Sequence, residues 1–274
     1  MSIIPANKEN IKKAAAIIRA GGLVAFPTET VYGLGANALN ATSVSRIFEV
    51  KKRPFFDPII VHISSLPEIE GLVKDFGEME RKLAERFWPG PLTLVLPKKN
   101  IVPDIVTSGL ATVGIRMPAN ETAREFVRES GTPIAAPSAN IFGQISPTQA
   151  AHVESQLGSD VDMILDGGKC SVGIESTIIK IENGVPIILR HGGLPVDEIE
   201  KVAGKVISNI LPNKNIEGAG DNNGLESPGQ LPYHYSPLTP LVLFEDFDEI
   251  NITGLKAGLI LFKKRRLIKD FFAV

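Results

Sequence analysis

The sequence predicts an α/β or α+β fold built around a substantial sheet. Over the first 211 residues, short apolar runs of strand length alternate with segments whose apolar residues recur at helical spacing. The chain has 274 residues, of which 43% are hydrophobic and 22% charged, an ordinary globular composition. That length suits one large domain, or one domain with a smaller piece. A disordered, collagenous or disulfide-stapled chain is excluded.

The local patterns predict the following order of elements. Asn7 is placed to cap a first helix, which Gly21 and Gly22 end. A buried strand over 23–26 follows and stops at Pro27. Further helices are expected from Thr42 and over 78–88, 121–130 and 147–157, and further strands over 58–63, 92–96, 112–116, 134–136, 163–165, 177–181 and 187–189.

The composition divides the chain into three parts. Residues 1–211 form the main predicted domain, and 212–237, rich in Asn, Gly and Pro, are typical of a linker. Residues 238–274 carry strand-like runs but are too few to bury a core of their own comfortably. We therefore expect this last part either to pack on the main domain or to be the remnant of a larger one.

The charge and cysteine content exclude several classes of protein. With 29 Lys and Arg against 31 Asp and Glu, the net charge of −2 draws the chain to neither nucleic acid nor anionic membranes. Cys170 is the single cysteine, which excludes an intramolecular disulfide and fits a reducing compartment. Charges interrupt the apolar stretches, and the first residues lack a signal-peptide pattern, so we expect a cytoplasmic protein.

Familiar catalytic motifs are absent from the sequence. The four histidines have no metal-ligand spacing, and no P-loop, dinucleotide-binding glycine pattern or nucleophile elbow is present. We therefore expect no protein metal site and no catalytic triad.

Polar clusters instead follow the predicted strands and one helix end. Each has a structural explanation: a Thr in a turn, Lys and Arg at a helix end, a core His in a strand, or an Arg that pairs with a carboxylate. Ser146 with Gln149, and Pro147 between them, predicts a capping box for the helix over 147–157. Taken together, however, the clusters repeat one pattern, in which an apolar strand brings Arg, His, Ser or Thr to its end beside Gly or Pro. This repetition indicates a shared cationic, hydroxyl-rich cleft suited to a polyanion such as a nucleotide. The clusters span residues 26–35, 51–54, 58–63, 113–118, 135–149, 173–177 and 188–193.

These clusters also carry a family resemblance. The strings P-T-E-T-V-Y-G-L-G, P-I-I-V-H-I, F-W-P-G-P-L-T-L-V-L, V-G-I-R-M-P, A-P-S-A-N and E-S-T-I-I, with the K-x-R-P helix end, resemble the threonylcarbamoyl-AMP synthase family, whose domain is called YrdC-like. The match covers residues 5–205 in order. His234-Tyr235-Ser236-Pro237 is similar to the linker of the longer, two-domain branch.

The resemblance implies a twisted, open, mixed sheet with a concave ligand-binding face. It implies synthesis of threonylcarbamoyl-AMP and pyrophosphate from L-threonine, bicarbonate and ATP, with Mg²⁺ carried on ATP, for threonylcarbamoyladenosine modification of tRNA. Downstream tRNA-modifying threonylcarbamoyltransferase proteins would be partners. No protein nucleophile is needed for this nucleotidyl transfer, so catalysis would be positioning and charge stabilisation.

The resemblance also assigns site residues. Positions that hold threonine are matched by Thr30, His62, Arg116, Ala136 and Ser176. Positions around ATP are matched by Lys51, Arg53, Asp57, Thr112, Ser138, Asn140, Ser146, Arg190 and Tyr235.

Two departures keep alternatives open. Asp57 stands where the family usually has Asn, and an ionised carboxylate only accepts hydrogen bonds and repels phosphate. The segment over 238–274 is also shorter than the family's second domain, so the resemblance implies a truncated C-terminal α/β segment. The alternatives are an inactive paralogue, a module that binds double-stranded RNA or tRNA, and carbamoyl-adenylate chemistry on another acceptor.

Overall fold

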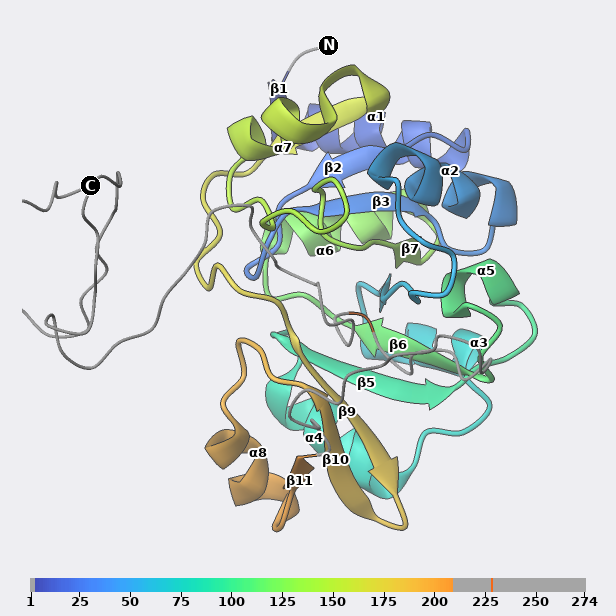
Figure 1. Ribbon diagram of the computed structural model, residues 1–274, viewed down its shortest axis with the longest axis vertical. Helices are drawn as coiled ribbons and strands as arrows, with labels where there is room; N and C mark the ends of the chain where they lie inside the picture. Colours follow the sequence, from blue (N-terminus) through green and yellow to red (C-terminus); the bar gives the residue numbers. More distant parts are fainter. Residues whose placement is uncertain (1–2, 209–227, 229–274) are drawn as a thin grey trace, which may run out of the picture. The chain divides into compact units, whose positions relative to one another are not determined.

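The computed structural model describes residues 3–208 and Pro228. Eleven strands form one mixed sheet in the order β1-β8-β2-β3-β7-β4-β6-β5-β9-β10-β11 (Figure 1). The predicted linker, apart from Pro228, and the predicted C-terminal segment lie outside the described residues. The strands are β1 (Ile3–Pro5), β2 (Val24–Phe26), β3 (Gly33–Asn37), β4 (Val61–His62), β5 (Leu92–Pro97), β6 (Thr112–Arg116), β7 (Ile134–Ala135), β8 (Met163–Asp166), β9 (Thr177–Glu182), β10 (Val185–Arg190) and β11 (Ile207–Ser208).

Helices pack on both faces of this sheet, and the predicted mixture of helices and strands is confirmed. The Asn7 side chain accepts a hydrogen bond from the Asn10 backbone N–H, so the predicted cap of α1 is confirmed. Longer helices are α1 (Lys8–Arg19), α2 (Ala41–Lys51), α4 (Glu78–Phe87), α6 (Glu121–Ser130), α7 (Ala150–Leu157) and α8 (Val196–Ala203), and short ones are α3 (Ile69–Leu72) and α5 (Asp104–Thr107).

Three local predictions differ from the structure. The predicted strand over 58–63 contains only β4, and β3 begins inside the cluster over 26–35, which was interpreted as a turn. The predicted capping box is wrong: α7 begins at Ala150 with Gln149 as its N-cap, and no side chain caps it. The Ser146 hydroxyl donates instead to the carboxylate of Glu175, 3.0 Å away, because a long-range partner displaces the local one.

Successive side chains of a strand point to opposite faces of the sheet, and here one face meets the large core while the other carries a pocket. Val61, Ile115 and Ile179 belong to the large core that also contains residues of α2, α4 and α8. Their strand neighbours His62 and Arg116 lie on the opposite face. Helices α1 and α6 pack together over only part of that face, around residues of β2 and β8. Residues of β4, β6 and β10 on the rest of this face line a pocket.

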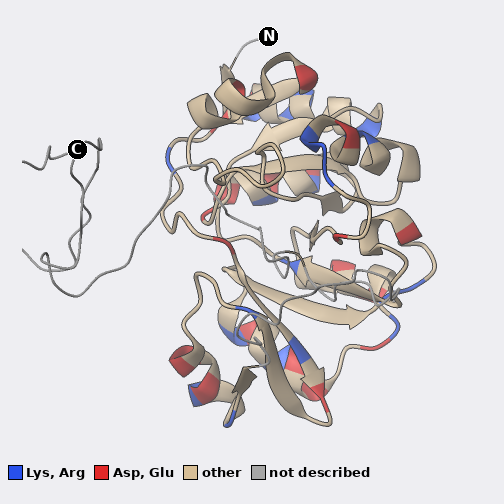
Figure 2. Cartoon of the chain, in the orientation of Figure 1, with Lys and Arg blue, Asp and Glu red and all other residues tan. Residues whose placement is uncertain are grey.

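Basic and acidic residues are interspersed over the helices and loops of the described part in the view of Figure 2. This distribution agrees with the net charge of −2 for the whole chain.

Candidate active site

One pocket gathers polar residues from six of the seven sequence clusters. Its walls combine three basic side chains with a histidine, a hydroxyl and a carboxylate. The lining residues are Val31, Gly33, Arg53, Pro58, Ile60, His62, Arg116, Ala136, Pro137, Ser138, Glu175, Arg190 and Pro228. Of the residues assigned by resemblance, Arg53, His62, Arg116, Ala136, Ser138 and Arg190 therefore lie on one pocket.

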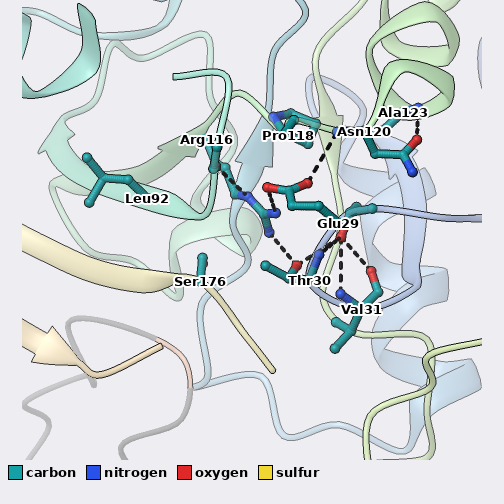
Figure 3. A network of polar contacts seen from close by, with 12 residues as sticks. Glu29, Thr30, Val31, Leu92, Arg116, Pro118, Asn120, Ala123 and Ser176 are labelled. Atoms are coloured by element: carbon teal, nitrogen blue, oxygen red, sulfur yellow. Dashed lines mark hydrogen bonds and ion pairs between the residues drawn. The ribbon is translucent and has the colours of Figure 1, made fainter. Parts of the chain in front are cut away.

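Arg116 lines this pocket and is held by two residues from the β2–β3 loop (Figure 3). Its guanidinium forms a buried ion pair with Glu29, at 2.6 Å between Nη2 and Oε1. Its Nη1 donates to the Thr30 hydroxyl at 2.9 Å, and Thr30 shares a further hydrogen bond with Thr28. The guanidinium is therefore held in one orientation while it lines the pocket. Glu29 lies in the polar cluster over 26–35, but no sequence pattern indicated its pairing with Arg116.

His62 lies beside Arg116, because the two residues are register partners on the parallel strands β4 and β6. The imidazole is buried and packs edge-on against the Phe26 ring, with 6.0 Å between ring centroids. Burial, and then the Arg116 charge, lower the pKa of His62 to about 3. The ring is therefore neutral near pH 7, and its Nδ1 has no hydrogen-bond partner among the described residues.

Arg190 reaches the pocket through an irregularity in the β9–β10 pairing. Ile188 pairs with Ile179, but Arg190 pairs with Ile178, so the register shifts between them. Regular alternation would send Arg190 to the core side with Ile188, and the shift turns it to the pocket side instead. Its guanidinium donates to the Ser176 carbonyl and hydroxyl.

Ser176 itself is fully buried and does not line the pocket. Its hydroxyl is 2.8 Å from that of Thr93, and it accepts from Arg190 at 3.1 Å. Ser176 therefore connects the cation at Arg190 to the sheet floor at β5.

Arg53 forms the second cationic wall, immediately after α2. Its Nη2 pairs with the Asp57 carboxylate at 2.9 Å, and both side chains are almost fully buried. Nε also donates to the main-chain carbonyl of Asp57, and Nη2 to that of Pro58. Burial raises the pKa of the Asp57 carboxyl, although Arg53, Arg190 and Lys51 act to lower it. Asp57 thus lies behind the pocket wall and contacts a cation of this chain.

Lys51 also lies behind the wall. The residue is 1% exposed, and its Nζ donates to the main-chain carbonyls of Ser138 and Asn140. Burial, and then the Arg53 charge, lower the pKa of Lys51 well below its usual range. The Asn140 side chain donates to the carbonyls of Ile141 and Gln144. Both residues thus shape the loop that carries Ser138.

Two further residues complete the rim. Glu175 accepts from Ser146 and lies 3.8 Å from the Arg190 guanidinium, so it bridges two residues that were assigned to ATP. Pro228 lines the pocket, and its carbonyl accepts from Arg190 at 3.3 Å. Tyr235 lies outside the described residues.

A second hollow adjoins the first and shares Pro58, Ile60 and Pro228 with it. Its walls are mainly apolar, including Ile178 and Val95, with the Thr112 side of β6 at its edge. A pocket lined by three arginines and a mainly apolar hollow therefore lie next to each other.

The decisive comparison is with protein families. The family model described as "telomere recombination", which covers Sua5, YciO and YrdC proteins, matches residues 16–192. The chain belongs to the Sua5/YciO/YrdC family.

Individual members of the Sua5/YciO/YrdC family are similar to this chain over most of its length. Threonylcarbamoyl-AMP synthase of Pyrococcus abyssi is 49% identical over 236 residues, which is 86% of this chain and 68% of the relative. That of Bacillus subtilis is 44% identical over 89% of this chain and 69% of the relative. The crystal structure of P. abyssi Sua5 complexed with L-threonine matches with a TM-score of 0.81 and 48% identity, over 86% of this chain and 69% of that one. Escherichia coli YciO, at 24% identity and a TM-score of 0.65, shows the same fold.

No described helix is long and apolar enough to cross a membrane. Within the same residues, no group of three or more His, Cys, Asp or Glu side chains is arranged to hold a metal ion.

Proposed function

We propose that this protein is a threonylcarbamoyl-AMP synthase, which makes threonylcarbamoyl-AMP and pyrophosphate from L-threonine, bicarbonate and ATP. The observation that carries the proposal is a single pocket whose lining includes three arginines, Arg53, Arg116 and Arg190, together with the His62 imidazole. One guanidinium suits the carboxylate of an amino acid, and the other two suit a triphosphate. The names of the relatives and the threonine complex of P. abyssi Sua5 support the same activity.

We assign the threonine carboxylate to Arg116. Glu29 and Thr30 hold its guanidinium, so little side-chain entropy is lost on binding. The neutral His62 ring offers a lone pair to a donor of the substrate, either the amine or the hydroxyl. With a pKa of about 3, His62 orients this group through a hydrogen bond and does not store its proton.

The chemistry then proceeds without a protein nucleophile. The threonine ammonium and bicarbonate give the N-carboxylate, one water and one proton. A carboxylate oxygen of this carbamate attacks the α-phosphorus of ATP, and the bond to the bridging oxygen breaks to release pyrophosphate. The class of reaction is nucleotidyl transfer, because the adenylyl group moves to the carbamate oxygen. The protein contributes alignment and stabilisation of the charge that moves onto pyrophosphate.

The triphosphate is assigned to Arg53, Arg190 and the Ser138 and Ser146 hydroxyls, and the adenosine to the neighbouring apolar hollow near Thr112. We propose Mg²⁺ as the ion that accompanies ATP and screens its negative charge. Since the described residues lack a metal-binding cluster, its oxygen ligands would come mainly from the phosphates. Glu175 is the carboxylate among the lining residues that could add a ligand.

The product is a mixed anhydride and needs an acceptor. We propose that tRNA-modifying threonylcarbamoyltransferase proteins use it to form threonylcarbamoyladenosine, in the cytoplasm.

The test is pyrophosphate release by the purified chain. We expect release with ATP, Mg²⁺, L-threonine and bicarbonate together, and loss of release when either threonine or bicarbonate is omitted. Mass spectrometry should detect threonylcarbamoyl-AMP in the complete mixture. Pyrophosphate release that is independent of threonine would contradict the proposal.

A further inference from the structure

A negative charge is buried directly behind the cationic wall of the pocket. Asp57 has no exposed surface, and its carboxylate is 2.9 Å from the guanidinium of Arg53, which lines the pocket. The charges of Arg190 and Lys51 also act on this carboxylate. The cations assigned to the triphosphate therefore already have an anion of this chain beside them.

The carboxylate is not required to orient Arg53. The main-chain carbonyls of Asp57 and Pro58 accept from Nε and Nη2 at 3.2 and 2.8 Å. These carbonyls remain when the Asp57 side chain is changed. What the side chain adds is a full negative charge, placed where solvent screens it little.

We propose that the Asp57 carboxylate is an internal competitor of the triphosphate, which weakens the binding of ATP and pyrophosphate and so promotes pyrophosphate release. The attraction between Arg53 and an incoming phosphate is partly offset by repulsion between that phosphate and Asp57. The inference rests on the proposed function and adds to it a residue that limits how tightly the inorganic product is held. Asp57 thus acts on the bound phosphates through its charge from behind the pocket wall, and Arg53 is the residue that contacts them.

Asp57→Asn tests this directly, because the amide has nearly the same shape without the charge. Calorimetry with pyrophosphate, and separately with ATP, should give dissociation constants about tenfold lower than for the unchanged protein. The threonine dissociation constant should stay within twofold, because Arg116 pairs with Glu29 and not with Asp57. Glu182→Gln removes one charge from an ion pair with Lys180 on the β9–β10 hairpin and should leave all three constants unchanged.

The pH dependence separates a charge effect from a structural one. Because burial raises the pKa of the Asp57 carboxyl, this group is neutralised sooner than an ordinary aspartate as the pH falls. Arg53, Arg190 and Lys51 are the charged groups that face it. The ratio of the pyrophosphate dissociation constants of the unchanged protein and Asp57→Asn should therefore fall toward one as the pH is lowered and the carboxyl is protonated. A purely structural role gives a ratio that does not change in this way.

The outcomes are distinct. Equal or weaker pyrophosphate binding by a folded Asp57→Asn overturns the inference and leaves the proposed function standing. If that variant does not fold, Asp57→Ser provides the same measurement, and failure of both to fold makes the carboxylate structural and overturns the inference as well. If the unchanged protein binds neither ATP nor pyrophosphate, the proposed function fails and the inference fails with it.

Discussion

Arg116→Gln is the variant that most directly tests the threonine end of the pocket. In the structure, the Arg116 guanidinium is 2.6 Å from the Glu29 carboxylate and 2.9 Å from the Thr30 hydroxyl, and all three side chains are buried. Glutamine keeps a hydrogen-bonding end but removes the positive charge. The variant therefore deletes the proposed carboxylate partner and leaves Glu29 without its counter-charge.

The expected magnitudes follow from these contacts. A hydrogen bond to a charged group contributes about 1.5–3 kcal/mol, which corresponds to roughly 10- to 150-fold in the dissociation constant. Since the unpaired Glu29 also repels the threonine carboxylate, we expect the upper end, about 100-fold weaker threonine binding. Breaking a buried ion pair by removal of one partner should lower the free energy of unfolding by about 3–5 kcal/mol.

The assay pairs calorimetry with L-threonine and urea unfolding, on Arg116→Gln and on the double variant Glu29→Gln with Arg116→Gln. The double variant removes both charges, so it should recover most of the lost stability. It should recover only the part of the threonine affinity that repulsion by Glu29 removes, so threonine should still bind roughly 10-fold more weakly than to the unchanged protein. Threonine binding by Arg116→Gln within threefold of the unchanged protein would refute the assignment. Binding by the double variant within threefold of the unchanged protein would refute it equally, because the guanidinium would then be dispensable.

Three further predictions follow from burial and close packing. His62→Gln should flatten the pH dependence of stability. In the unchanged protein the folded ring stays neutral down to about pH 3, while the unfolded ring binds a proton near pH 6.5, so the free energy of unfolding falls by about 1.4 kcal/mol per pH unit below 6.5. Urea unfolding at pH 7, 6 and 5 measures this slope in both proteins. Lys51→Met removes two buried hydrogen bonds to the Ser138 loop, so it should lower the free energy of unfolding by about 1–3 kcal/mol and weaken ATP binding. The salt dependence of ATP binding should stay unchanged in that variant, whereas a phosphate ligand would alter it. Gly192→Ala should lower the melting temperature and weaken the binding of both threonine and ATP, because a Cβ there would lie 2.3 Å from the backbone carbonyl carbon of Ser176. Gly71→Ala is the control and should change neither property, because a Cβ at Gly71 has no atom within 4 Å.

Sequence patterns predicted the fold class and most of the elements. β6 and α6 occupy the residues expected from their patterns, and the Asn7 cap forms as expected. These features succeed because alternation, helical spacing and caps depend on residues a few positions apart. The capping box at Ser146 fails for the same reason: its competitor, Glu175, is 29 positions away and no local pattern reports it.

The roles of individual site residues depended on contacts that are distant along the chain. Arg116 was expected to need either a carboxylate or an anionic ligand, and the carboxylate is Glu29, 87 positions earlier. Lys51 was assigned to ATP by resemblance, yet its ammonium contacts the carbonyls of a loop 87 and 89 positions later. Such pairs are set by the strand order of the sheet, which places β3, β7, β4 and β6 side by side.

By itself, the sequence determined the alternation of helices and strands and the family to which the chain belongs, which long motifs indicate. It also determined that cationic and hydroxyl side chains lie at the ends of strands. Only the tertiary structure decided which of them face a common pocket and which are buried behind it. Arg190 shows why: simple alternation would send it into the core, and a shift in pairing between β9 and β10 turns it into the pocket. Local spacing specifies a side chain's position on its own strand, but its partners and its side of the sheet depend on how that strand pairs with its neighbours.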